Sequence, residues 1–175
     1  TSEIYHADNY GTYLAGQRIS GAGQLIDATP LMLVDWVYGQ AKALAVDGGY
    51  VVAGPDWNDS TIVRARRIGT NLQPVGAAFT VPSTNLASNG SQLYVTWVRD
   101  FINMVGSPMS LAGVRTVPNG VVLFSDPSIA YYSINAAHDG SNWWFEWGAG
   151  SDYRTMRINS AGQVLDPGGV LAPIV

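Results

Sequence analysis

The chain has 175 residues, of which 47% are hydrophobic and 13% charged, enough for a folded domain with a core. Its formal net charge of −4 provides no basic surface for a phosphate backbone, so we expect no nucleic-acid partner. No apolar run approaches the roughly 20 residues of a membrane helix, so we expect no membrane span. Without cysteine the chain has neither a disulfide nor a thiolate metal site.

Glycine and proline are plentiful, whereas glutamate occurs twice and lysine once, which disfavours helices. An Arg-Ile segment ending in Asp recurs, most clearly in "RISGAGQLID" (18–27) and "RINSAGQVLD" (157–166). Weaker copies occur at 66–76 and 115–124. Recurrence at intervals of roughly 45 residues is typical of repeat architectures. The repeat units span about 1–38, 39–84, 85–133 and 134–175.

In chain order, each unit predicts short strands separated by turns. The first unit starts inside its second strand, so its inner strand is missing. In the first two units we expect strands or hairpins at 3–8, 31–34, 44–54, 61–68 and 77–81. In the last two units we expect them at 86–97, 110–117, 129–132, 136–147 and 170–174, with an insertion at 100–109.

The hairpin "AAHDGSNWWFEW" (136–147) shows the local logic. Its Asp139-Gly140 pair supplies the positive φ of a type I′ turn, or of a longer variant with a left-handed glycine, and we expect this turn to be exposed. The period of two places Trp144 and Glu146 on one face. The opposite face, which we expect to be buried, carries Trp143, Phe145 and Trp147.

Four short antiparallel strands in about 45 residues are the content of a β-propeller blade. The chain resembles the blade repeats of secreted bacterial β-propeller proteins, in which a DG-x-x-Y-x-V-x-W hairpin is followed by R-V/I-x-x-x-G-x-x-L-D. The resemblance implies an all-β, propeller-like fold of about four four-stranded blades, the first incomplete. A two-sheet β-sandwich is the alternative. The composition, with a single lysine and much aspartate, and the resemblance to secreted proteins indicate a secreted or cell-surface location. The missing inner strand of the first unit leaves a sheet edge open, so we expect further blades from a partner chain or a parent protein.

The arginines that recur once in each repeat unit allow two interpretations. They could form a carboxylate-binding cluster like that of a sialidase, or each could pair with an aspartate such as Asp27 or Asp166. Repetition in every unit favours the pairs, because a catalytic site needs different residues on different blades. The arginines in question are Arg18, Arg67, Arg115 and Arg157.

The function we expect is a non-catalytic binding or scaffolding module with a carbohydrate or protein ligand. The alternative is part of a secreted glycoside hydrolase or sialidase-like enzyme, with Glu146 as the acid, although no second carboxylate can be assigned. Glu146 either pairs with the nearby Arg154 or Arg157 or lines a cleft with Trp144. We assign no catalytic residue, cofactor or metal ligand, and interpret "PDWNDS" (55–60) as a polar loop rather than a calcium site. The ligand-binding candidates are Trp144, Glu146, Trp57 and Arg154.

Overall fold

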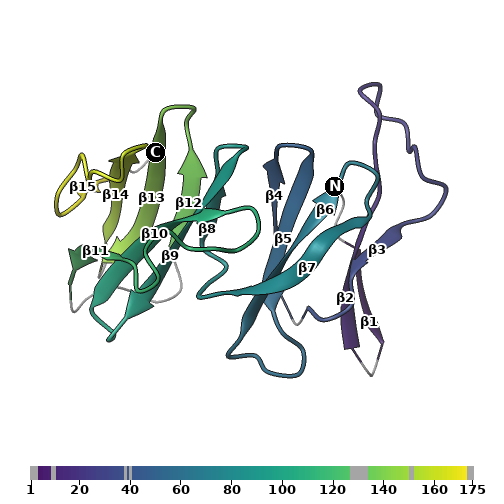
Figure 1. Cartoon of the computed structure of the whole chain (residues 1–175), viewed down its shortest axis with the longest axis horizontal. Coiled ribbons are helices and arrows are strands. Elements are labelled where there is room, and N and C mark those ends of the chain that lie inside the picture. The colour runs from purple at the N-terminus through teal and green to yellow at the C-terminus, as the bar shows by residue number, and fades with distance from the viewer. Residues whose placement is uncertain are drawn as a thin grey trace. The chain divides into compact units, whose positions relative to one another are not determined.

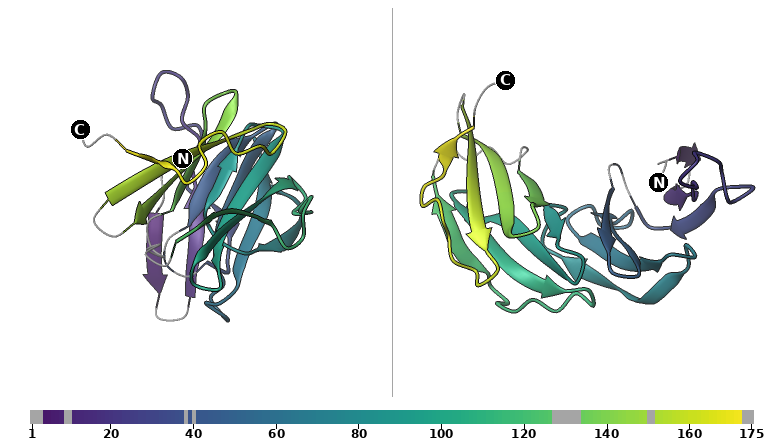
Figure 2. Two further views of the ribbon diagram at one scale, coloured as in Figure 1. Left: turned by 90° about the vertical axis from the view of Figure 1, so that its left-hand side faces the viewer. Right: turned by 90° about the horizontal axis from the view of Figure 1, so that it is seen from above.

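The chain is described by a computed structural model, and every structural statement below concerns the residues that it describes, which are 4–8, 11–37, 39, 41–126, 134–149 and 152–172. Within them the regular structure is entirely β, with fifteen strands in four antiparallel sheets (Figure 1). Each sheet is a meander of consecutive strands, which can be followed from two further directions in Figure 2. The expected all-β, propeller-like fold with an incomplete first blade is therefore confirmed, and two sheets in each unit are also compatible with sandwich packing. A membrane-crossing helix is not found among the described residues.

The first of two compact units comprises Thr1–Thr84 and holds two sheets. Its three-stranded sheet consists of β1 (Ile4–Asp8), β2 (Gly11–Gly16) and β3 (Leu31–Val34). Its four-stranded sheet consists of β4 (Lys42–Val46), β5 (Gly49–Pro55), β6 (Val63–Gly69) and β7 (Pro74–Val81). The three-stranded sheet begins with the strand expected at 3–8, as predicted for a unit without its inner strand.

The second unit comprises Asn85–Val175 and also holds two sheets. The first consists of β8 (Leu86–Ser88), β9 (Gln92–Arg99), β10 (Asn103–Ser110) and β11 (Val121–Ser125). The second consists of β12 (Asn135–His138), β13 (Asn142–Ala149), β14 (Asp152–Asn159) and β15 (Val170–Leu171). The strand expected at 129–132 lies outside the described residues, as do the last residues of the one expected at 170–174.

The strand expected at 110–117 is wrong, because the third strand of this sheet is β10, and seven of its eight residues lie in the expected insertion at 100–109. A tight turn follows β10 at once: the Ser110 N–H donates to the Val114 carbonyl, and the Gly113 N–H donates to the Ser110 carbonyl. The same pair of hydrogen bonds follows Arg157, from Asn159 and Gly162. Counting back from the turn therefore puts Pro108, not Arg115, at the position of the repeated arginine.

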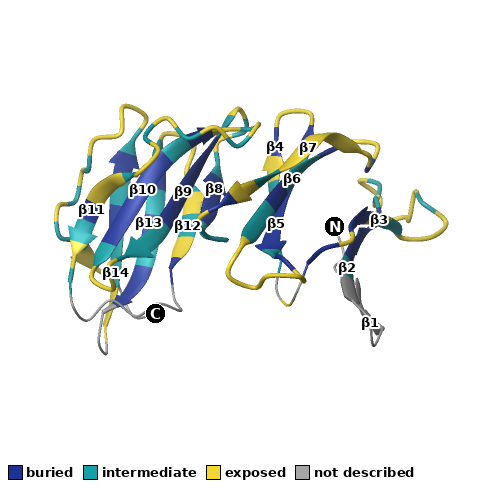
Figure 3. Cartoon of the chain, turned by 60° about the horizontal axis from the view of Figure 1, so that its bottom comes forward, coloured by how far each residue is buried: buried dark blue, intermediate teal, exposed yellow. Residues whose placement is uncertain are grey.

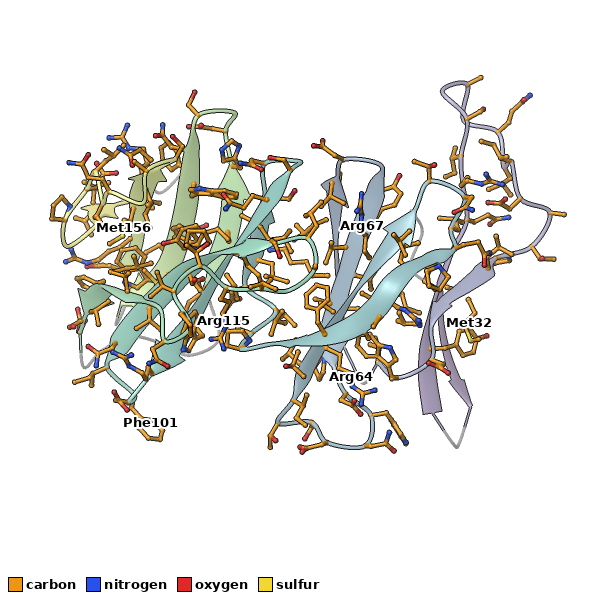
Figure 4. All side chains as sticks on the ribbon, in the orientation of Figure 1. Met32, Arg64, Arg67, Phe101, Arg115 and Met156 are labelled. Carbon is orange, nitrogen blue, oxygen red and sulfur yellow. The ribbon has the colours of Figure 1, made fainter. Side chains whose placement is uncertain are left out.

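Each unit has a core that joins its two sheets. In the second unit, alternation along β13 buries one side of the strand, as expected, and this core includes Met156 (labelled in Figure 4). Its buried members are Ala87, Tyr94, Met104, Leu123, Ile134, Trp143, Phe145, Trp147, Met156 and Ile158. The buried core of the first unit consists of Leu14, Leu33, Val34, Trp36, Val37, Val52, Ile68 and Leu72. The outer strand β7, by contrast, is mostly exposed (Figure 3).

Two of the turn glycines fit against tryptophans. Gly169 has a φ of 70°, and a Cβ added there would lie 2.4 Å from Cη2 of the buried Trp147. Gly120 has a φ of 68°, and its Cβ would lie 2.5 Å from Cη2 of Trp97. Because any larger residue would collide with the indole, the chain needs glycine at both points.

Candidate functional site

Two of the four candidate residues, Trp144 and Glu146, share one face of a sheet in the second unit. Trp144 and Glu146 lie on the same face of β13, as the alternation predicted. Arg154 pairs with Trp147 across β13 and β14, and therefore points to the opposite, core face. Trp57 is exposed in the β5–β6 loop of the first unit and is described separately below. The candidate site therefore rests on Trp144 and Glu146.

Three neighbouring strands supply two rows of side chains on this face. In one row, Trp144 lies between Ala137 of β12 and Arg157 of β14. In the adjacent row, Glu146 lies between Asn135 of β12 and Thr155 of β14. Directly opposed residues in antiparallel strands project from the same face of the sheet. We call this surface, formed by Asn135, Ala137, Trp144, Glu146, Thr155 and Arg157, the Trp144 face.

The Trp144 face is slightly hollowed. A shallow pocket of about 170 Å³ lies between β12, β13 and β14. Both Trp144 and Glu146 line it and are half-buried, whereas Asn135 and Ala137 are exposed. Ala137, which pairs with Trp144 across the hairpin, contributes only a methyl group beside the indole.

The indole of Trp144 is held in place by two neighbours. Its Nε1 donates a hydrogen bond of 2.5 Å to Oδ2 of Asp139, in the turn before β13. The guanidinium carbon of Arg157 lies 5.5 Å from the ring centroid, within cation–π range. This indole hydrogen bond, with further ones from the backbone N–H groups of Asn142 and Ser141, lowers the pKa of the Asp139 carboxyl. The aromatic ring is thus presented in one fixed orientation.

Arg157 is itself fixed by an aspartate. Its Nε and Nη2 donate to the Asp166 carboxylate at 2.8 and 2.9 Å, a bidentate pair. This pairing lowers the pKa of Asp166. The carboxylates of Asp139 and Asp166 are therefore both occupied by donors within the protein.

Glu146 differs from these aspartates, because within the described part of the chain its side chain has neither an ion pair nor a hydrogen bond. The expected pairing with an arginine is not formed. Arg157 is taken by Asp166, and Arg154 points to the other face, where its Nη1 donates to the Gly168 carbonyl at 3.2 Å. The second expectation, a cleft shared by Glu146 and Trp144, matches the structure.

Each repeated arginine has a contact of its own, so the two arginines within one unit do not form a carboxylate-binding cluster. Arg18 pairs with Asp27, its Nη2 lying 2.5 Å from Oδ1, just as Arg157 pairs with Asp166. The pairing prediction is wrong for the other two. Arg67 donates to the Asp47 carbonyl at 2.6 Å, because Gly76 stands where an aspartate would be needed. The guanidinium of Arg115 lies 5.5 Å from the ring centroid of Trp97.

The loop around Trp57 uses its polar groups internally. The buried Asp56 binds Arg64, with 2.6 Å between Oδ2 and Nε, and also accepts from the Asn58 N–H. Asp59 accepts from the backbone and the hydroxyl of Thr61, which lowers its pKa. Among the described residues no three His, Asp or Glu side chains gather as a metal site would require. Trp57 therefore lies on a loop that is held by an ion pair and by hydrogen bonds between its own residues.

Two members of the Trp144 face, Asn135 and Thr155, were not predicted from the sequence. They reach the site through strand pairing with Glu146, and only the register of β12 and β14 places them there. The hairpin signal around Asp139 was sufficient to find Asn135, because counting back from the turn puts it opposite Glu146. Comparisons of the chain with protein-family models, with curated proteins and with solved structures found no match. The function must therefore be inferred from the geometry of the site.

Proposed function

We propose that the chain is a non-catalytic binding or scaffolding module of a secreted or cell-surface protein, and that the Trp144 face is its binding surface. The observation that carries the proposal is a half-buried indole, held by Asp139 and Arg157, that lines a shallow pocket beside a carboxylate without a partner among the described residues. A flat aromatic face with a few polar groups at its edge is a common way to bind and orient a ligand.

A carbohydrate is the ligand class that we propose for this pocket. The apolar face of a sugar ring would stack on Trp144, while its hydroxyls would exchange hydrogen bonds with Asn135, Glu146 and Thr155. The volume of about 170 Å³ is below the roughly 300–1,000 Å³ of common small-molecule pockets. The pocket would therefore take one ring of a larger glycan rather than enclose a whole ligand.

Glycoside hydrolysis, the alternative, is less well supported by the same site. It requires a proton-donating acid and a second carboxylate at a defined separation. Glu146 is the one carboxylate among the described residues that line the pocket. Asp139 and Asp166 do not line the pocket, and their oxygens already accept hydrogen bonds from groups of the protein. A second catalytic group is therefore missing from the Trp144 face.

A glycan array followed by calorimetry on any hit tests this proposal. We expect binding without turnover, loss of binding in Trp144→Ala and weaker binding in Glu146→Gln. Trp57→Ala is the matched control, since it removes an exposed tryptophan from the other unit and should bind normally. Glycan release that disappears in Glu146→Gln would support the hydrolase instead. A hit unaffected by Trp144→Ala would contradict the assigned surface.

We also propose that further blades, from a partner chain or a parent protein, complete the assembly. The three-stranded first sheet supports this idea, because β1 pairs on one side with β2, and its other edge has no partner strand among the described residues. An open edge of this kind is normally covered in native proteins.

A further inference from the structure

The two sheets of the second unit show how one blade covers the next. Tyr94 of the β8–β11 sheet packs against the β12–β15 sheet, with its ring centroid 5.5 Å from that of Trp143 and 5.2 Å from that of Phe145. Each sheet thus has two different faces. We call the face on the Tyr94 side the trailing face and the face on the Phe145 side the leading face.

The Trp144 face is the trailing face of the last sheet. Tyr94 pairs with Ala87 across its hairpin, and Trp144 pairs with Ala137 in the same way. Ala87 is buried, whereas Ala137 is exposed. The strands β10 and β14 can be aligned by the equivalent turns that follow them. In this alignment Met104 of β10 corresponds to Tyr153 of β14. Met104 is 0% exposed and Tyr153 is 53% exposed.

The first sheet has an exposed apolar pair at the turn end of its leading face, although Ala15 and Gln17 on the same face are buried. Ile19 bridges to Leu25 just as Ile158 bridges to Val164, so the two isoleucines are equivalent. Ile158 is 0% exposed and Val164 packs against the core, because the β8–β11 sheet covers them. In contrast, Ile19 is 49% and Leu25 63% exposed. The last sheet therefore has exposed residues on its trailing face, and the first sheet has an exposed apolar pair at the turn end of its leading face.

We propose that copies of this chain associate head to tail, with the Trp144 face of one copy covering the Ile19–Leu25 face of the next. The inference rests on the proposed role of the Trp144 face as a binding surface and names a second copy as its occupant. The internal contact of Tyr94 with Phe145 supplies the template for this pairing. An interface between two different faces is heterologous, so it closes into a ring or continues as a filament.

Glu146 makes the inference distinguishable from sugar binding. Its equivalent in the covered sheet is Thr96, which is fully buried. Covering Glu146 with another sheet would bury a carboxylate without a partner, which is unfavourable. Glu146→Thr should therefore tighten association by about tenfold or more. The same substitution should weaken binding of a sugar that needs the carboxylate as an acceptor.

Light scattering over a concentration series, with variants on each face, tests the assembly. We expect the wild type to grow beyond a monomer, and both Tyr153→Asp and Ile19→Asp to remain monomeric alone. A mixture of the two should form a 1:1 dimer, because each supplies the face that the other lacks. Val114→Asp is the matched control, since Val114 is an exposed apolar residue outside the two proposed contact surfaces. Leu25→Asp and Trp144→Ala serve as second variants if circular dichroism shows that either of the first two fails to fold.

A wild type that stays monomeric at all concentrations would overturn the inference, as would a mixture that fails to associate when the wild type does. Sugar binding at Trp144 by a strictly monomeric chain would leave the proposed function standing while this inference falls. A chain that shows no sugar binding and no self-association would contradict both proposals. Rescue in the mixture, with tighter association of Glu146→Thr, would establish the head-to-tail contact.

Discussion

Truncation of Trp147 should destabilise the second unit more than any single change at the Trp144 face. Its side chain is fully buried, its ring centroid lies 5.0 Å from that of Phe124, and Gly169 packs against its edge. Trp147→Ala removes these contacts and leaves a cavity, so we expect a loss of about 3–5 kcal/mol in the free energy of unfolding. Urea unfolding followed by far-ultraviolet circular dichroism measures this loss without depending on the removed fluorophore.

The indole N–H of Trp147 refines this prediction. It is buried without a hydrogen-bond partner among the described residues. Trp147→Phe keeps most of the apolar contacts and removes this unsatisfied donor, so its cost should be only about 1 kcal/mol. The reasoning would be refuted if Trp147→Ala lay within 1 kcal/mol of wild type, or if Trp147→Phe were as damaging as Trp147→Ala.

Three further predictions follow from local contacts. Gly169→Ala should cost about 2–4 kcal/mol in urea unfolding, since its positive φ and the edge of Trp147 both oppose a Cβ; a neutral effect would contradict the contact. The arginine pair lowers the folded-state pKa of Asp166, so its stabilisation is present above pH of about 4 and is lost as pH falls; Asp166→Asn should flatten the acid limb of a stability-versus-pH curve. Burial raises the pKa of Tyr94 to about 12, so the folded state loses stability as pH rises from about 10 to that value; Tyr94→Phe should remove this loss, and an unchanged alkaline limb would argue against a buried phenol.

The hairpin core and its faces could be predicted from the sequence because strand alternation is a local property. The Asp139-Gly140 turn fixed the phase of β13, and the phase fixed which rings are buried. Of the two turn types considered, the structure has the positive φ on Gly140, at 97°, and not on Asp139. Trp144 and Glu146 were found for the same reason.

The third sheet was harder to predict because its turn lacks the usual residues. The β9–β10 hairpin turns at Asp100 and Phe101, which have φ values of 55° and 63° without a glycine or asparagine. The exposed Phe101 marks this tip in Figure 4. Without a recognisable turn, residues 100–109 resembled an insertion. Arg115 was therefore assigned to the third strand, which ends at Ser110.

The partner of Glu146 could not be predicted from distance along the sequence. Arg154 and Arg157 are close to it in the chain, but the first lies on the opposite face and the second is held by Asp166. Arg154 and Arg157 are three residues apart in β14 and therefore project from opposite faces of the sheet. Arg157 is engaged by Asp166, which follows the next turn. The polar neighbours Asn135 and Thr155 likewise depend on the register between strands.

Hydroxyl-radical footprinting of the protein, alone over a concentration series and with any glycan found by the array, tests most directly whether the Trp144 face is the binding surface. We predict that oxidation of Trp144 falls when its face is occupied, whichever occupant covers it, while the exposed Phe101 reacts at an unchanged rate. Head-to-tail association predicts that protection of Ile19 and Leu25 accompanies it at high protein concentration. A Trp144 oxidation rate that stays constant under every one of these conditions would contradict the account.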